Sequence, residues 1–166
     1  MDVNEAVKRL RQGVFIDVEA TGLHEGSYPI EVGFAHIHTD ATGRESVKSW
    51  SYLIKPHEAW NMDESWNYEA EAVHKIPMAD LVHGEPLDRV VSDLRDVMKT
   101  HINLFSDAPS YELMWLAKAL KSGCLDQKIA SNLIGALRWS LQCATCAGGG
   151  WRSPITTATA NWTACR

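Results

Sequence analysis

Two carboxylates one residue apart lie in an apolar stretch near the start of the chain. Residues 15–23 read Phe-Ile-Asp-Val-Glu-Ala-Thr-Gly-Leu, which predicts a strand that a Thr-Gly pair ends. Because side chains alternate across a strand, Asp17 and Glu19 are expected on one face. Two like charges at the end of a buried strand repel each other, and a bound Mg²⁺ or Mn²⁺ ion would relieve that repulsion. The alternative is an exposed strand end with two ordinary acids.

A second acidic element lies later in the chain. Residues 102–106 predict a short buried strand. Residues 107–120 follow it and predict a helix with an apolar stripe, which begins at Pro109 or Ser110. The junction of a strand with a helix falls at the carboxyl end of a sheet, where sites of α/β proteins usually lie. Asp107 or Glu112 would therefore be able to reach a metal held by the first pair of acids. Alternatively, Asp107 caps the helix and Glu112 is a first-turn acid favoured by the helix dipole.

The remaining periodic segments predict the elements that position these acids. Alternating apolar residues and short turns favour three antiparallel strands, at 14–18, 30–38 and 47–54. Residues 86–98 carry an apolar stripe at helical spacing, which predicts an amphipathic helix that packs on the core. The chain is therefore expected to form an α/β fold.

Length and composition limit the class of protein. A chain of 166 residues fits one domain with one sizeable core. The net charge of −5 disfavours a basic nucleic-acid-binding surface, although metal-binding acids also make a nuclease site negative before cations bind. No apolar run approaches the roughly 20 residues of a membrane span, so no membrane association is expected. Residues 1–10 lack the apolar core of a signal peptide, and we expect a cytoplasmic protein.

The segment from Asp17 to Leu23 closely resembles the first motif of the DEDD 3′–5′ exonucleases, the DnaQ-like family with an RNase H-like fold. That motif reads Asp-x-Glu-x-Thr-Gly-Leu, and every position of it is present here. The resemblance implies an RNase H-like mixed sheet, with three antiparallel strands and then a parallel strand, flanked by helices. It also implies that Asp17 bridges two metal ions, Mg²⁺ or Mn²⁺, and that Glu19 binds the first of them. The backbone at Thr21 and Gly22 would face the terminal nucleotide, with Leu23 packing on its base.

Two later segments are similar to family motifs but not identical to them. The second motif is His-Asn-x-x-x-Tyr/Phe-Asp. When it is aligned without gaps to residues 106–116, its metal-binding Asp corresponds to Glu112. Asp107 is the competing ligand, because it lies nearest the strand end. His74-Lys-Ile-Pro resembles the family's His-Gly-Ile-Thr and implies a substrate contact at His74. A histidine that packs locally at a helix end is the alternative.

The third family motif, His-x-x-x-x-Asp on a late helix, has no counterpart. The last histidine is His101 and the last acid is Asp126. The family histidine acts as general base, and the Asp completes the metal site. We therefore expect residues 1–126 to form the exonuclease-like domain, with a fold that is incomplete at its C-terminus. Residues 127–166 are expected to be an atypical segment, either non-native or disordered.

The function implied by the resemblance is metal-dependent 3′–5′ exonuclease activity. Such an enzyme hydrolyses phosphodiester bonds at the 3′ end of single-stranded DNA or RNA, with two metal ions that stabilise the attacking and leaving oxygens. The catalytic residues would be Asp17, Glu19 and Glu112 or Asp107. Loss of the general base predicts weak or absent activity in this chain. The alternative is a catalytically inactive module of the same fold that binds nucleic acid or a protein partner.

Overall fold

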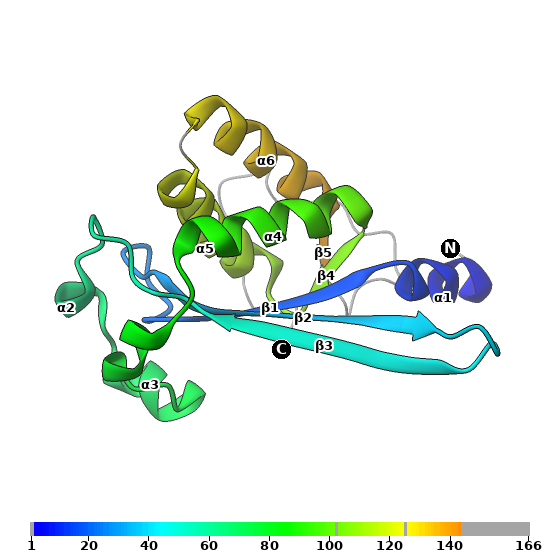
Figure 1. Cartoon of the computed structure of the whole chain (residues 1–166), viewed down its shortest axis with the longest axis horizontal. Helices are drawn as coiled ribbons and strands as arrows, with labels where there is room; N and C mark the ends of the chain where they lie inside the picture. Colours follow the sequence, from blue (N-terminus) through cyan, green and yellow to red (C-terminus); the bar gives the residue numbers. More distant parts are fainter. Residues whose placement is uncertain (1, 102, 125, 144–166) are drawn as a thin grey trace.

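The computed structural model describes residues 2–101, 103–124 and 126–143 (Figure 1). Its helices and strands follow one another in this order: α1 (Val3–Arg11), β1 (Val14–Ala20), β2 (Pro29–Thr39), β3 (Glu45–Leu53), α2 (Met62–Ser65), α3 (Tyr68–His74), the 3₁₀ helix η1 (Met78–His83), α4 (Leu87–Thr100), β4 (Leu104–Ser106), α5 (Pro109–Gly123), α6 (Gln127–Ser140) and β5 (Leu141–Cys143). The strands and long helices predicted from the sequence up to residue 120 are all present, with small differences at their ends.

One mixed sheet organises these elements. Its five strands lie in the order β3-β2-β1-β4-β5. β1 pairs antiparallel with β2, and β2 with β3, whereas β4 is parallel to both β1 and β5. The predicted arrangement of three antiparallel strands followed by a parallel strand is thus confirmed. β5 adds a second parallel strand.

The core lies between the sheet and the helices that cover one of its faces. In Figure 1 the helices α4, α5 and α6 all lie on the same side of the sheet. The main hydrophobic cluster joins buried side chains of β1, β2 and β4 to those of these helices. Helix α4 contributes Leu87, Val90, Val91 and Leu94 to the cluster, and helix α5 contributes Trp115, Leu116, Ala119 and Leu120. The apolar side chains along one face of α4 are therefore part of the core, as their helical spacing predicts.

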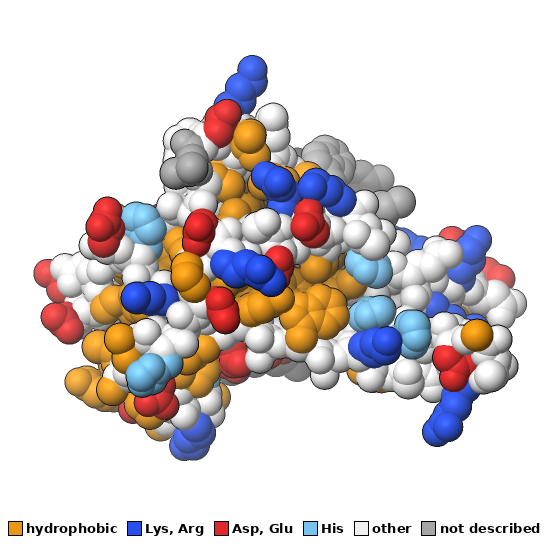
Figure 2. Space-filling model, in the orientation of Figure 1, with side chains coloured by type: hydrophobic (Ala, Val, Ile, Leu, Met, Phe, Trp, Pro, Cys, Tyr) orange, Lys and Arg blue, Asp and Glu red, His pale blue; other side chains and the backbone are white. Residues whose placement is uncertain are grey.

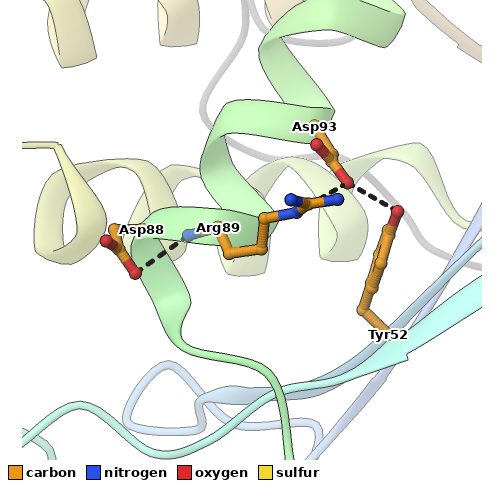
Figure 3. A network of polar contacts seen from close by, with 4 residues as sticks. All are labelled: Tyr52, Asp88, Arg89 and Asp93. Carbon is orange, nitrogen blue, oxygen red and sulfur yellow. Dashed lines mark hydrogen bonds and ion pairs between the residues drawn. The ribbon is translucent and has the colours of Figure 1, made fainter.

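A polar network fixes α4 on the edge strand β3 (Figure 3). The hydroxyl of Tyr52 donates a hydrogen bond of 2.5 Å to Asp93 Oδ2, and Arg89 Nε lies 3.3 Å from the same oxygen. The hydrogen bond to Asp93 is the main reason that the pKa of Tyr52 is raised. The carboxylate of Asp93 therefore connects α4 to Tyr52 of the sheet and to Arg89 in the preceding turn of the helix.

The segment between β3 and α4 forms a lobe at one end of the sheet, which carries α2 and α3 (Figure 1). Tyr68 is 77% exposed and Val73 is 81% exposed. Figure 2 shows hydrophobic and acidic side chains close together at this end of the molecule. Within the described part of the chain, every helix is too short or too polar to cross a membrane.

Helix α6 packs on the same core as the preceding elements. Ala130 and Leu137 are fully buried, and Leu137 belongs to the main hydrophobic cluster. β5 then pairs with β4 along its whole length. The predicted domain boundary at residue 126 stays a prediction, and what was predicted for residues 144–166 lies outside the described part of the chain.

The burial of Leu137 leads to a stability prediction. The substitution Leu137→Ala should lower the free energy of unfolding by about 2–5 kcal/mol, because it leaves a cavity under α6. Ile129→Ala is the matched control, since Ile129 is 42% exposed on the same helix, and it should change stability by less than about 0.5 kcal/mol. Urea unfolding measures both values. Equal, small effects would show that α6 does not pack on the core.

Candidate metal centre

β1 presents its two acids on the face opposite to the core. Its buried side chains are Val14, Ile16, Val18 and Ala20, which alternate with less buried ones. Asp17 and Glu19 therefore share the other face of the strand, as the sequence predicts. Thr21 follows the strand and is fully buried. Its backbone N–H donates a hydrogen bond to the Tyr28 carbonyl, and the Tyr28 N–H donates one to Thr21 Oγ1.

The parallel pairing of β1 with β4 brings a third acid to the same end of the sheet. Phe15 is opposite Phe105, so continuing that register places Asp107 level with Asp17. Glu112 follows in the first turn of α5. Ligand oxygens of Asp17, Asp107 and Glu112 all lie within 4.8 Å of one another. The structure therefore brings both candidates for the second-motif ligand to Asp17.

Glu112 is the buried member of this cluster, at 2% exposed. Burial raises the pKa of Glu112 to about 7, and the nearby Asp107 and Asp17 add to the shift, while hydrogen bonds from Ser106 and from its own backbone oppose it. No hydrogen-bond donor among the described residues reaches its buried Oε2 atom. A buried carboxylate oxygen without a donor, beside two other carboxylates, is an arrangement that a cation would satisfy.

The pKa values of the β1 acids respond to the same crowding. Burial raises the pKa of Asp17, and the charges of Asp107 and Glu31 raise it further. Burial also raises the pKa of Glu19, followed by the charges of Asp17, Glu31 and Asp107. Glu19 is thus close to the cluster, but it is not one of the three residues whose ligand oxygens lie within 4.8 Å.

Glu31 is the acid that the sequence interpretation missed. It lies directly opposite Glu19 in the antiparallel pair of β1 and β2, so the two side chains share one face. The sequence did indicate which face of β2 Glu31 occupies. Ile30 and Val32 on either side of it are apolar and buried, so Glu31 must point to the opposite face of the strand. What the sequence could not supply was the register that sets Glu31 against Glu19.

Helix α5 also holds the loop that follows β1. Trp115 Nε1 donates a hydrogen bond of 2.8 Å to Ser27 Oγ, which in turn donates to the carbonyl of His24. The ammonium group of Lys118 donates to the carbonyl oxygens of Glu25 and Ser27. The helix that carries Glu112 therefore fixes the loop that follows Thr21.

The residues expected to contact substrate lie around this loop. Leu23 is 66% exposed, whereas Gly22 is buried. The backbone N–H of Asn67, at the start of α3, donates a hydrogen bond of 2.8 Å to the Thr21 carbonyl. A Cβ atom on Gly22 would lie 3.2 Å from the Cβ of Asn67, which explains the small residue at this contact.

His74 lies at the other end of α3. Its ring is partly buried, and burial lowers its pKa against the opposing effects of Glu71 and Glu31. Glu31 is the acid opposite Glu19, so His74 lies near the acidic face of the sheet. The structure thus places the histidine near the predicted site, and its contact with substrate stays a prediction.

Comparison with solved structures gives the class of fold. The metal-free E. coli exonuclease I in complex with single-stranded DNA aligns with a TM-score of 0.58 and 13% identity, over 79% of this chain and 27% of that one. A product-bound exonuclease I aligns with a TM-score of 0.57 and 15% identity, over 79% and 29% of the two chains. Exonuclease I of Methylocaldum szegediense gives a TM-score of 0.55 and 12% identity, over 79% and 27%.

The chain therefore has the exonuclease I fold, and the resemblance to DEDD exonucleases is confirmed at the level of the fold. It spans less than a third of the length of these exonuclease I chains. No protein-family profile matches the sequence, and no curated protein sequence matches it.

The donor set of the cluster fits a hard divalent cation. All three grouped ligands are carboxylates, which Mg²⁺ and Mn²⁺ prefer over the nitrogen and sulfur ligands that suit zinc or copper. Glu19 and Glu31 add further negative charge nearby. The arrangement can therefore hold a divalent metal between the middle of β1 and the carboxyl end of β4.

The raised pKa of Glu112 predicts a pH-dependent stability. The folded chain binds the Glu112 proton more tightly than the unfolded chain, so this contribution is complete below about pH 4.5 and is lost as the pH rises through about 7. A shift of this size corresponds to about 3 kcal/mol. In EDTA, the wild-type chain should lose about this much unfolding free energy between about pH 5 and about pH 8, relative to Glu112→Gln.

Urea unfolding at both pH values measures the difference. The raised pKa values of Asp17 and Glu19 act in the same direction in both proteins and therefore largely cancel in the comparison. A wild type and a Glu112→Gln variant with the same pH dependence would contradict the account of Glu112.

Proposed function

We propose that the chain is a metal-dependent nuclease that removes nucleotides from the 3′ end of single-stranded DNA or RNA. The observation that carries the proposal is the cluster of Asp17, Asp107 and Glu112 beside the carboxyl end of β4, in which one buried carboxylate oxygen of Glu112 has no hydrogen-bond donor among the described residues. The exonuclease I fold supports it, since solved exonuclease I structures include complexes with single-stranded DNA and with a dT13 oligonucleotide.

The proposed roles follow from the positions of the acids. Asp17 and Glu19 of β1, with Glu112 or Asp107 at the junction of β4 and α5, would hold the two Mg²⁺ or Mn²⁺ ions. Bound divalent ions supply positive charge beside the attacking and leaving oxygens of the phosphodiester. Leu23 would pack on the terminal base, because its side chain is 66% exposed shortly after the strand that carries the first two acids.

The activity of this chain is expected to be weak. No histidine follows His101 and no acid follows Asp126, so the His-x-x-x-x-Asp motif is missing from this sequence. Loss of a general base commonly reduces the rate by about 10²–10⁴-fold. This same absence favours a second candidate function, an inactive module of the exonuclease fold that binds single-stranded nucleic acid or a protein.

A labelled oligonucleotide separates the two functions. With a 5′-labelled single strand and Mn²⁺, we expect stepwise shortening from the 3′ end, which Asp17→Asn abolishes because it removes one carboxylate of the cluster. Asp80→Asn is the matched control, since Asp80 is exposed on η1, and it should leave the activity unchanged. Binding without any shortening above the Asp17→Asn background would favour the inactive module.

The ligand roles of Asp107 and Glu112 are tested by metal affinity. Asp107→Asn and Glu112→Gln should each weaken Mn²⁺ binding about tenfold or more, because even residues that only orient a metal ligand are commonly worth about 10–100-fold in affinity. Calorimetric titration gives the affinities, with Glu58→Gln at an exposed acid as the control. An unchanged affinity in either variant would limit that residue to a structural role at the start of α5.

A further inference from the structure

A histidine cluster, formed by His36, His38 and His101, lies where β2 meets the end of α4. The ring centroids of His36 and His38 are 6.4 Å apart, and those of His36 and His101 are 5.7 Å apart. His36 and His38 are two residues apart on β2, so their side chains point to the same face of the strand. His101 directly follows α4. Figure 2 shows histidine side chains gathered on the surface to the right of its centre.

This cluster is separate from the carboxylates of the candidate metal centre. His36 is opposite Val14 at the start of β1, whereas Glu19, near the other end of β1, is opposite Glu31. Residues directly opposite each other in an antiparallel pair share one face of the sheet. Because Val14 belongs to the core, His36 is on the face that the helices cover, and Asp17 and Glu19 are on the other face. The imidazoles and the acids therefore differ both in position along β1 and in the face of the sheet.

The imidazole nitrogens of the cluster are available to a ligand. The rings of His36 and His38 are partly exposed, and neither forms a hydrogen bond with another described residue. His101 Nδ1 lies 3.4 Å from the carbonyl oxygen of Gln12. Because a carbonyl oxygen can only accept, Nδ1 carries the proton there, and the neutral ring keeps its lone pair on Nε2. Histidines that bind metals commonly use their second ring nitrogen in this way, which fixes the tautomer and the orientation of the ring.

The spacing of the rings is close to that around a zinc ion. With Zn–N distances of about 2.0–2.1 Å and tetrahedral angles, two zinc-bound imidazoles have ring centroids about 5 Å apart. The separations from His36 to His38 and to His101 exceed this value by only about 1 Å. Among the described residues, the nitrogens of the cluster do not all lie within 4.8 Å of one another, so a shared ion requires the rings to turn towards it. Partly exposed side chains make such rotations within nanoseconds.

A cleft beside the cluster gives access from the solvent. It has a volume of about 330 Å³, and Trp50 and Tyr52 of β3 line it together with Thr100 and His101 at the end of α4. Trp50 packs edge to face against His36, with ring centroids 5.9 Å apart and an interplanar angle of 81°. The cluster therefore has a packed aromatic side chain on one side and open space on another.

We propose that His36, His38 and His101 bind a Zn²⁺ ion, with a water molecule as the fourth ligand. Imidazole nitrogens suit zinc, whereas the carboxylates at the other end of β1 suit Mg²⁺ or Mn²⁺, so the two sites select different cations. The ion would connect the end of α4 to β2 and so fix the β2–β3 hairpin against the helix. This zinc site goes beyond the proposed nuclease function and does not depend on it.

Zinc titrations of the whole chain test this assignment. In excess Mg²⁺, which occupies the carboxylates, calorimetry should show Zn²⁺ binding weakened about tenfold or more in His36→Ala, His38→Ala and His101→Ala. Even residues that only orient a metal ligand are commonly worth about 10–100-fold in affinity. His83→Ala is the matched control, since His83 is exposed on η1, and it should keep the wild-type affinity. Zinc bound by cysteines is common to all these proteins and does not affect the comparison.

Thermal unfolding gives a second readout that needs no activity. Zinc should raise the unfolding midpoint of the wild type, because an ion that binds only the folded chain stabilises it. The shift should be lost in His101→Ala and kept in Lys48→Ala, which removes an exposed positive charge opposite His36. Unfolding without zinc identifies any variant that does not fold.

Two results would overturn the proposal. One is a wild-type zinc affinity in the folded His36→Ala and His38→Ala variants, which would place any bound zinc elsewhere in the chain. The other is a zinc-dependent rise in the unfolding midpoint that is equal in the wild type and His101→Ala, or absent from both. Failure of the nuclease assay leaves each of these measurements unchanged, so the two proposals succeed or fail separately.

Discussion

The repulsion among carboxylates at one end of the sheet is the constraint on which the site depends. Asp17, Asp107 and Glu112 have ligand oxygens within 4.8 Å of one another, and Glu112 is almost fully buried. Such a cluster is unfavourable without a cation or a proton. Burial is the main cause of the raised pKa values of Asp17 and Glu112, and the charges of the neighbouring acids raise them further. Two features hold the acids together despite this repulsion. One is the parallel register of β1 and β4, and the other is the start of α5 shortly after β4.

The same elements that hold the acids also shape their surroundings. α5 supplies Glu112 and anchors the loop after β1 through Trp115 and Lys118. α3 contacts the end of β1 at Thr21 and places His74 near Glu31. The acids, the loop and the histidine thus lie around the carboxyl-terminal half of β1, although the residues come from distant parts of the sequence.

The sequence predicted the parts of this arrangement that depend on local pattern. The alternation in β1 placed Asp17 and Glu19 on one face, and the helical spacing in α4 identified core residues. Asp107 and Glu112 could not be separated, because a helix cap and a metal ligand use the same residue types in the same turn. The structure brings both to Asp17. Glu31 was missed because its position opposite Glu19 depends on the register of β1 and β2, which a single strand's pattern does not contain.

The central claim is that the carboxylate cluster is a divalent-metal site, and that Glu112 releases its proton to the solvent when the ion binds. Calorimetry of Mn²⁺ binding in buffers of different ionisation enthalpy counts the protons released. Because the pKa of Glu112 is about 7, more than about half a proton should be released at about pH 6.5, and the number should fall towards zero at about pH 8.5. Absence of Mn²⁺ binding, or binding without proton release at the lower pH, would contradict the account.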